Sequence, residues 1–296
     1  MSPTVAERSG ARVAVVTGAA SGIGRALALE LAAQGAALGL ADVDVDGLAD
    51  IAAACRRTGV DVHAEVVDVT DEAAVRAHAR AVVERLGAPR LVVANAGIAA
   101  SGTVIGQPLA DVRRVIEVDL FGVIHTCRAF LPALIEGGGR LVTISSVFGL
   151  IGAPKQSAYN AAKFGVRGYT EALRQEASLA GWPVTVSCAH PGGVKTAIAR
   201  SALIGPDEDA ATTARMFDLI ARTSAPAAAR AILRGAAADR PRILVGVDAR
   251  VFAALARTTG AGYTDLIGRS WWGRRIFQVT GSVHGARGCV PAGDTG

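Results

Sequence analysis

Two side chains with complementary proton chemistry lie one helical turn apart near the middle of the chain. Tyr159 and Lys163 belong to the run SAYNAAK, and on a helix their spacing places both side chains on one face. An ammonium beside a phenol favours the phenolate, so this pair could move a proton to or from a bound oxygen atom. An unperturbed tyrosine has a pKa of about 10, and lowering it by about 3 units takes roughly 4 kcal/mol. We expect Lys163, a low-dielectric pocket and a nearby bound cation to supply this shift together.

A serine hydroxyl belongs to the same candidate site. Ser146 directly follows the strand candidate Arg140–Ser145. From the end of a strand, its hydroxyl can hydrogen-bond the oxygen that reacts. If the register of the strand differs by one residue, Ser145 takes this place instead. A hydroxyl, a phenol and an ammonium together predict acid–base chemistry on a C–O group.

A glycine-rich turn near the N-terminus predicts a phosphate site. The run TGAASGIG begins at Thr17, at the end of the strand candidate Arg12–Thr17, and leads into the helix candidate Ile23–Gln34. Glycines allow a tight turn and close approach of a pyrophosphate, while the helix N-terminus presents free N–H groups. We therefore predict a dinucleotide-binding turn formed by Gly18, Ser21, Gly22, Ile23 and Gly24.

The residue after the second strand predicts which dinucleotide is bound. The carboxylate of Asp42 can accept hydrogen bonds from both ribose hydroxyls of NAD and would repel the 2′-phosphate of NADP. Ser21 and Val43, where an NADP enzyme would offer a basic side chain, are not basic. We therefore predict NAD as the cofactor. The alternative is that Asp42 only caps the next helix, a role that Asp44 or Asp46 could also fill.

Short apolar runs alternate with longer Ala/Leu-rich stretches, and this alternation predicts the elements that position the site. The strand candidates are Arg12–Thr17, Ala37–Ala41, Asp61–Val67, Leu91–Asn95, Arg140–Ser145, Val184–Ala189 and Arg242–Val245. The helix candidates are Ile23–Gln34, Val45–Thr58, Asp71–Leu86, Leu109–Leu131 and Ser157–Ala180. Strands that are apolar throughout suit a parallel sheet covered on both faces. The pattern predicts an α/β fold with a doubly wound, mostly parallel seven-stranded sheet (a Rossmann fold) and helices on both faces.

The regular alternation ends in the last third of the chain. We predict one domain over residues 1–260, with a segment at about 197–225 that covers the site, and a C-terminal extension over residues 261–296. Within the extension, Leu266–Arg287 is basic and contains Trp271 and Trp272. This segment could cover a neighbouring subunit's pocket, lie on an anionic membrane surface, or pack as an ordinary helix on its own domain. We expect Pro291–Gly296 to be frayed.

Composition excludes several classes of protein. Hydrophobic residues make up 51% of the chain, which is enough for a large core, and aromatic residues make up 4%, which argues against stacking on single-stranded nucleic acid. The net charge of +5 comes entirely from residues 200–296, so no general nucleic-acid-binding face is expected. No apolar run is long enough for a membrane-spanning helix, and no signal pattern opens the chain, so we predict a cytoplasmic protein. The cysteines show no metal-ligand spacing and are expected to be reduced, with no metal bound; they are Cys55, Cys127, Cys188 and Cys289.

Taken together, the motifs resemble those of the short-chain dehydrogenase/reductase family, in its short single-domain branch. In chain order they are TGAASGIG, DVT from Asp68, ANAG from Ala94, ISS before YNAAK, and PGGVKT from Pro191. The resemblance implies that Tyr159 is the general acid/base. It also implies that Lys163 bonds the nicotinamide ribose and lowers the pKa of Tyr159, and that Ser146 polarises the substrate C–O group.

The same resemblance implies the remaining cofactor contacts. Asp68 and the backbone of Val69 would hold the adenine, and Asn95 would lie beneath the cofactor. Val194 and Thr196 would fix the nicotinamide carboxamide, although Thr196 could instead cap a helix. The other motif residues implied in cofactor binding are Ala96, Gly97, Pro191 and Gly192.

One position departs from the family pattern. The family usually has VNLFG within its fourth helix, whereas this chain has VDLFG, with Asp119 in place of asparagine. The backbone carbonyl there is thought to hold a water that links Lys163 to a proton relay. That role survives the change, but the side-chain amide donor does not. We expect Asp119 to be tolerated in an active enzyme with an altered pH profile.

Residues that follow the motifs suggest the substrate. The positions expected to face it are apolar, namely Ile98, Phe148, Leu150, Ile151, Ile198 and Leu203, although such residues can equally be core. No Arg or Lys is evidently placed to bind a carboxylate or phosphate, although Lys155 and Lys195 lie near. We predict hydride transfer between NAD and a hydrophobic secondary alcohol or ketone. The alternatives are a non-catalytic NAD-binding regulator or scaffold, or a dehydratase, isomerase or epimerase of the same fold. The family implies a homodimer or homotetramer through Leu109–Leu131 and Ser157–Ala180.

Overall fold

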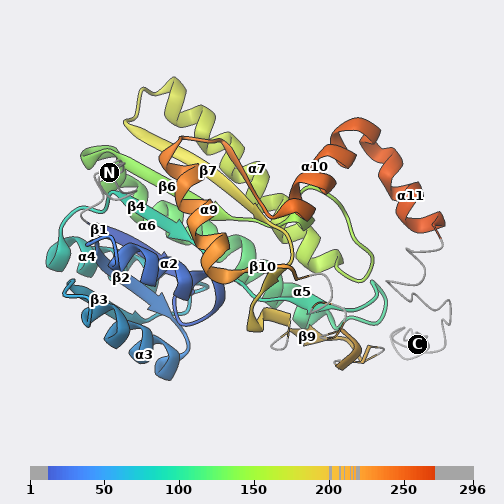
Figure 1. The fold of residues 1–296 in the computed structure, drawn as a ribbon, viewed down its shortest axis with the longest axis horizontal. Coiled ribbons are helices and arrows are strands. Elements are labelled where there is room, and N and C mark those ends of the chain that lie inside the picture. Colours follow the sequence, from blue (N-terminus) through green and yellow to red (C-terminus); the bar gives the residue numbers. More distant parts are fainter. Residues whose placement is uncertain are drawn as a thin grey trace, which may run out of the picture.

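The computed structural model gives the arrangement shown in Figure 1. It describes residues 13–199, 202–206, 208, 209, 211–213, 215, 217 and 221–270. Several predictions lie outside these residues, namely those on Arg12, on Trp271 and Trp272, on Cys289 and on Pro291–Gly296.

A seven-stranded parallel sheet forms the centre of the fold, as predicted. The strands are β1 (Val13–Thr17), β2 (Ala37–Asp42), β3 (Val62–Val66), β4 (Leu91–Ala94), β6 (Gly139–Ile144), β7 (Val184–Pro191) and β11 (Arg242–Val245). Their order across the sheet is β11-β7-β6-β4-β1-β2-β3. The chain leaves β1 toward one edge and returns at β4 on its other side. Between these two strands the order reverses, and a crevice opens at their carboxyl ends.

Strand β1 shows why the sheet forms here. All its residues are buried, and they pair in parallel with β2 on one side and with β4 on the other. Val15, for example, lies between Gly39 and Val92. A strand covered on both faces needs apolar residues throughout, which the run VAVVT supplies.

Helices cover both faces of the sheet. On one face α2 (Gly22–Ala32), α3 (Val45–Arg56) and α9 (Ala225–Ala237) share a core cluster with β1 and β2. On the other face, α4 (Glu72–Leu86), α6 (Gly122–Gly137) and α7 (Ser157–Leu179) enclose a second cluster around Phe130. Phe130 is fully buried. Most predicted helix ends lie within one or two residues of those observed.

The predicted helix Leu109–Leu131 differs in structure. It begins as α5 (Leu109–Ile116), passes through a π-helical turn η1 (Glu117–Phe121), and continues as α6 to Gly137. The whole stretch Leu109–Gly137 is long and apolar enough by composition to cross a membrane. Val123, Cys127, Phe130 and Leu134 of this stretch pack in the cluster between the sheet and α4, as in a core helix.

Two pairs of very short strands and two C-terminal helices complete the crevice, and the sequence analysis did not predict them. The strands β5 (Ala100–Ser101) and β9 (Leu203–Ile204) form one parallel pair, and β8 (Val194–Lys195) and β10 (Thr223–Ser224) form another. Near the C-terminus, α10 (Val247–Thr259) and α11 (Tyr263–Arg269) are joined by the turn η4 (Gly260–Gly262). Two-residue strands are too short to give a periodic pattern, which is why they were missed.

Candidate active site

The glycine turn after β1 is built around places where a side chain would not fit. Gly18 and Gly22 have positive φ angles of 65° and 54°, a region that L side chains rarely adopt. A Cβ atom on Gly24 would lie 1.9 Å from the carbonyl oxygen of Gly18. The side-chain amide of Asn95 donates to the carbonyls of Thr17 and Gly18 at 3.0 Å and so fixes the turn. This cradle of backbone at a helix N-terminus fits a dinucleotide pyrophosphate.

Asp42 lies beside this turn and faces the same cavity. Its carboxylate accepts hydrogen bonds from the backbone N–H of Ala20 at 2.8 Å and of Asp44 at 3.0 Å. Asp44, not Asp42, caps helix α3 by accepting from the N–H of Gly47. The alternative in which Asp42 only caps the next helix is therefore wrong. A carboxylate in this place disfavours a second phosphate nearby.

Asp68 lies at the adjoining part of the cavity. Its carboxylate accepts from both the N–H and the hydroxyl of Thr70, at 2.9 Å and 2.8 Å, and pairs with Arg114 at 3.1 Å. Burial raises the pKa of Asp68, but the hydrogen bonds from Thr70 and Arg114 outweigh it and hold that pKa below its ordinary value. Arg114 also lines the cavity, and the sequence analysis missed it because it lies on a different element, helix α5.

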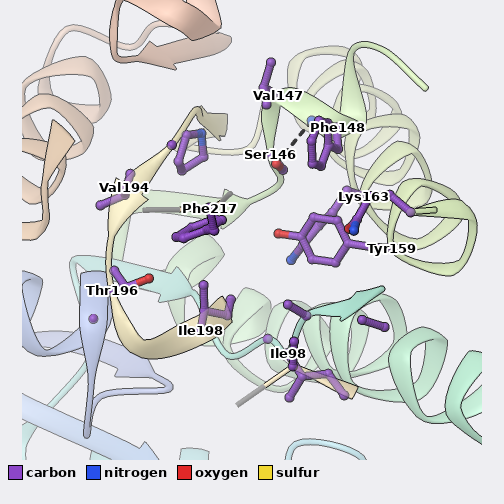
Figure 2. Close-up of a pocket in the computed structure, with 18 of the residues that line it drawn as sticks. Ile98, Ser146, Val147, Phe148, Tyr159, Lys163, Val194, Thr196, Ile198 and Phe217 are labelled. Atoms are coloured by element: carbon purple, nitrogen blue, oxygen red, sulfur yellow. Dashed lines mark hydrogen bonds between the residues drawn. The ribbon is translucent and has the colours of Figure 1, made fainter. Parts of the chain in front are cut away.

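Ser146, Tyr159 and Lys163 meet on one wall of the cavity (Figure 2). Tyr159 and Lys163 project from the first turns of α7, and the Lys163 Nζ lies 5.5 Å from the centre of the Tyr159 ring. Ser146 follows β6 and lines the same wall as Tyr159, and its hydroxyl accepts from the N–H of Phe148 at 3.2 Å. The hydroxyl of Ser145 instead donates to the carbonyl of Lys163 at 2.8 Å. Ser146 is thus the serine beside the phenol.

Asp119 forms a buried ion pair with Lys163. The Asp119 Oδ2 and Lys163 Nζ lie 3.0 Å apart, and the two side chains are 0% and 3% exposed. The other carboxylate oxygen of Asp119 accepts from the N–H of Ile98 at 2.7 Å. Lys163 also donates to the carbonyl of Ile144 at 3.2 Å. The residue that departs from the family pattern is therefore in direct contact with the lysine of the candidate site.

These charges change the proton affinities in the site. Burial lowers the pKa of Lys163, but the Asp119 carboxylate and the Tyr159 phenol outweigh it and raise that pKa above its ordinary value. Burial raises the pKa of Asp119, and the Lys163 ammonium only partly opposes this.

The pKa of Tyr159 departs from the sequence prediction. Burial raises it, and the Asp119 carboxylate adds to the rise, while Lys163 and the hydrogen bond with Ser146 lower it without compensating. The expectation that a low-dielectric pocket would help to lower this pKa was wrong, because burial disfavours the charged phenolate. Lys163 acts in the expected direction, but the protein's own side chains leave the pKa of Tyr159 above its ordinary value.

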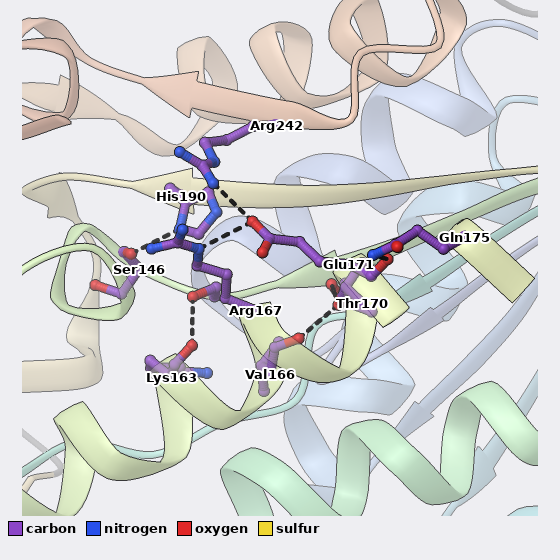
Figure 3. Close-up of polar contacts among 11 residues, drawn as sticks. Ser146, Lys163, Val166, Arg167, Thr170, Glu171, Gln175, His190 and Arg242 are labelled. Carbon is purple, nitrogen blue, oxygen red and sulfur yellow. Dashed lines mark hydrogen bonds and ion pairs between the residues drawn. The ribbon is translucent and has the colours of Figure 1, made fainter. Parts of the chain in front are cut away.

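A polar framework lies behind the wall formed by Ser146, Tyr159 and Lys163, the candidate catalytic wall (Figure 3). His190, on β7, is fully buried, and its Nδ1 lies 3.0 Å from the carbonyl oxygen of Ser146. Burial lowers the pKa of His190 to about 4, so the ring is neutral, and Nδ1–H donates because a carbonyl can only accept. Nearby, Glu171 on α7 pairs with Arg167 at 2.9 Å and with Arg242 on β11 at 2.6 Å. These contacts fix Ser146 and α7 relative to the sheet, and the sequence analysis missed them.

Most of the residues predicted to bind the cofactor surround one cavity of about 1340 Å³. Those that line it are Gly18, Ser21, Gly22, Ile23, Asp42, Asp68, Val69, Asn95, Ala96, Gly97, Tyr159, Lys163, Pro191, Gly192, Val194 and Thr196. Gly24 and Asp119 do not line it. They lie one layer behind, where Gly24 packs against Gly18 and Asp119 against Lys163.

The far end of the cavity is largely apolar. Of the side chains predicted to face a substrate, Ile98, Phe148, Ile151 and Ile198 line it, whereas Leu150 and Leu203 do not. Leu150 is buried, and Leu203 packs with the cluster around Val115. Further apolar lining residues, which the sequence analysis did not name, come from the covering segment and the C-terminal helices: Phe217, Val247, Val251, Phe252 and Ile267.

Two polar contacts hold this end of the cavity together. The Tyr263 hydroxyl on α11 accepts from the N–H of Gly152 at 2.8 Å. Lys155, which has a positive φ of 62°, lines the cavity and pairs with Glu208 of the covering segment at 2.7 Å. Lys195 is exposed and does not line the cavity. These two contacts join α11 and the covering segment to the loop before α7.

Comparison with known proteins gives consistent matches. The family model for short chain dehydrogenases matches residues 12–205, which include the glycine turn and the catalytic wall. SadH of Mycobacterium tuberculosis, assigned as an oxidoreductase, is 49% identical over 258 residues, which cover 86% of this chain and 94% of SadH. The 1-deoxy-11-beta-hydroxypentalenate dehydrogenase of Streptomyces avermitilis is 36% identical and covers 80% of this chain, with 85% of its own length matched. The crystal structure of a Burkholderia phymatum short-chain dehydrogenase/reductase in complex with NAD has a TM-score of 0.79 at 31% identity, covering 84% of this chain and 94% of that one.

Proposed function

The chain belongs to the short-chain dehydrogenase family and is an oxidoreductase, and from this premise we propose that it transfers a hydride between NAD and a hydrophobic secondary alcohol or ketone. The observation that carries the proposal is the meeting of Ser146, Tyr159 and Lys163 on one wall of a cavity that also contains the glycine cradle. The proposal gives the two ends of this cavity different tasks. One end holds the cofactor and the other the substrate.

The residues of the cofactor end suit a dinucleotide. Gly18, Gly22 and Gly24 leave room for a pyrophosphate against the N-terminus of α2, and Asp42 would accept hydrogen bonds from the adenine ribose. Asp68 and the backbone of Val69 would hold the adenine, and Asn95, Ala96, Gly97, Pro191, Gly192, Val194 and Thr196 would surround the nicotinamide half. When bound, NAD supplies the hydride acceptor. The lone carboxylate of Asp42 is our reason for preferring NAD to NADP.

Tyr159 would take the hydroxyl proton of an alcohol, or return it to a ketone. Ser146, on the same wall as Tyr159, would bond the same substrate oxygen and hold it in line. Lys163 would bond the nicotinamide ribose and stabilise the phenolate. Because the protein's side chains leave the pKa of Tyr159 raised, the positive charge of the bound oxidised cofactor would act with Lys163 to lower it.

The apolar end of the cavity supports the substrate class. Phe148, Ile198 and Ile267 offer van der Waals surface, and Lys155, which lines the cavity near them, is already paired with Glu208. The relative from Streptomyces avermitilis is named as a dehydrogenase of a hydroxypentalenate. We propose a hydrophobic secondary alcohol or the matching ketone rather than a sugar phosphate.

Assembly and location belong to the same proposal. The outer faces of the π-helical turn and of α7 expose Phe121 and Phe164, which are 42% and 38% exposed. Apolar residues on these two helices suit a homodimer or homotetramer. Cys55, Cys127 and Cys188 are buried free thiols, which suits the cytoplasm.

Steady-state NADH formation with a panel of hydrophobic secondary alcohols tests the proposal. Wild type would be compared with Tyr159→Phe, with NAD and NADP in parallel. We expect turnover with NAD that falls about a hundred- to ten-thousand-fold in the variant, because proton transfer is lost. Tyr169→Phe, on the same helix but away from the cavity, is the matched control and should keep full turnover.

The other outcomes separate the alternatives. Turnover that prefers NADP would contradict the role given to Asp42 and leave the chemistry standing. Tight NAD binding without turnover on any alcohol or ketone would favour a regulator or scaffold. Conversion of substrate without net NADH formation would favour a dehydratase, isomerase or epimerase of the same fold.

A further inference from the structure

Strand β3 and helix α4 bring two imidazoles and a carboxylate together outside the active-site cavity. His63 and Glu65 are two residues apart on β3, so their side chains leave the same face of the strand. His78 projects from α4, which packs on that face. None of these three residues lines the large cavity, and none has a part in the proposed hydride transfer.

The donor atoms have the spacing of a metal site. The Glu65 Oε2 lies 3.0 Å from His78 Nδ1 and 3.4 Å from His63 Nε2. One donor atom from each residue lies within 4.8 Å of the other two. Tetrahedral Zn²⁺ with bonds of about 2.0–2.1 Å places its ligand atoms about 3.3 Å apart. The two pairs that involve Glu65 lie close to this separation, and the rings of His63 and His78, which are stacked with centroids 5.6 Å apart, would turn so that both nitrogens face one ion.

Burial gives a second, independent argument. The Nε2 atom of His63 is buried and has no hydrogen-bond partner, although it lies close to the Glu65 carboxylate. Buried polar atoms are rarely left without a partner. His78 is only 1% exposed, so its ring is held in place, whereas the Glu65 side chain is 40% exposed and leaves a path to solvent. A cation bound here would satisfy the His63 nitrogen, and a water molecule could take a fourth position.

We propose that His63, Glu65 and His78 bind one divalent transition-metal ion of the zinc type. Two imidazoles and one carboxylate suit Zn²⁺ and its neighbours better than Mg²⁺ or Ca²⁺, which prefer oxygen ligands. The ion ties the edge strand β3 to α4. These two elements enclose the loop that carries Asp68 and Val69, so the ion also braces the loop at the cofactor end of the cavity.

Zinc titration of the full-length, tag-free protein tests the proposal. A chromogenic chelator would report competition for Zn²⁺, and the visible spectrum of Co²⁺ would report the ligand geometry. We expect one equivalent to bind, a tetrahedral Co²⁺ spectrum, and a rise in the unfolding temperature with saturating Zn²⁺. His63→Gln and Glu65→Gln should each weaken Zn²⁺ binding at least about tenfold.

His125→Gln is the matched control, because His125 contacts the carbonyl of Val69 and is not part of the cluster. It should leave Zn²⁺ affinity unchanged. The half-exposed Glu65 can be changed with little risk to folding, and unfolding in the absence of metal would verify that each variant is intact. The absence of saturable binding to wild type, or equal binding by wild type and both cluster variants, would overturn the proposal. Neither result depends on finding a substrate.

Discussion

The glycine turn and the catalytic wall line the same cavity but are built on opposite principles. The turn works through missing side chains, since a Cβ on Gly24 would collide with the carbonyl of Gly18. It is held by neutral hydrogen bonds from Asn95. The catalytic wall works through buried side chains, and the ion pair of Asp119 and Lys163 sits almost entirely out of water. Steric exclusion shapes the first region, and electrostatics shape the second.

Of the variants that test this comparison, Gly24→Ala should have the largest effect on stability, because it puts an atom where the turn tolerates none. The new Cβ would lie 1.9 Å from a backbone oxygen and 2.6 Å from the Asn95 amide nitrogen. We expect a loss of about 1–3 kcal/mol in the free energy of unfolding and at least a tenfold loss of NAD affinity. Denaturant unfolding and NAD titration measure the two effects.

Gly168→Ala is the control for that prediction. Gly168 lies exposed in α7, and a Cβ there would meet nothing within 4 Å. It should stabilise the protein by about 0.5–1 kcal/mol, as alanine does in a helix. If the two variants behaved alike, the steric account of the turn would be wrong.

Asp119→Asn tests the electrostatic region, and its effect should be intermediate. The Asp119 carboxylate raises the pKa of Tyr159, so removing its charge should lower that pKa. Alcohol oxidation needs unprotonated Tyr159, so the acid limb of kcat/KM should move to lower pH. Below the limb the variant would then be faster than wild type.

The pH dependence of kcat/KM measures this shift, and Glu117→Gln is its matched control. Glu117 lies on the same π-helical turn but is exposed, so the same loss of charge should leave the profile in place. An unchanged profile in Asp119→Asn would mean that the buried carboxylate does not act on Tyr159.

Tyr263→Phe should have the smallest effect, since it removes one hydrogen bond at the edge of the catalytic region. The Gly152 N–H would lose its acceptor, at a cost of about 0.5–1.5 kcal/mol. We expect KM for the alcohol to rise about two- to tenfold with kcat unchanged, because α11 lines the substrate end and touches no reacting atom. A fall in kcat with KM unchanged would place Tyr263 in the chemistry instead.

The two regions also differ in how well the sequence predicted them. The turn is local, so Gly18, Gly22 and Gly24 could be recognised from one continuous run beside a strand. The partners of the catalytic wall come from distant elements. His190 contacts the carbonyl of Ser146 from the neighbouring strand β7, 44 residues further along the chain, and the Ile98 N–H donates to Asp119 from the loop after β4. No local pattern marks such pairs.

The same limit explains the remaining differences. The interruption of the long helix at Glu117–Phe121 contains no glycine or proline to mark it, so the sequence predicted one continuous helix. The sequence predicted no metal because it shows no CxxC or Cys/His ligand spacing. The His63, Glu65 and His78 cluster forms only when β3 pairs at the sheet edge and α4 folds back onto it.

The π-helical turn makes the active site depend on the number of residues as well as on their types. A π turn holds one more residue than an α-helical turn, so deleting a single residue within Glu117–Phe121 would let the helix become regular. The π turn absorbs this extra residue locally, so α5 and α6 would stay close to their present orientation and the change would fall on the residues of the turn itself. Val118, Asp119 and Leu120 could not all keep their present directions. Length variation should therefore be strongly selected against at this one point of an otherwise ordinary core helix.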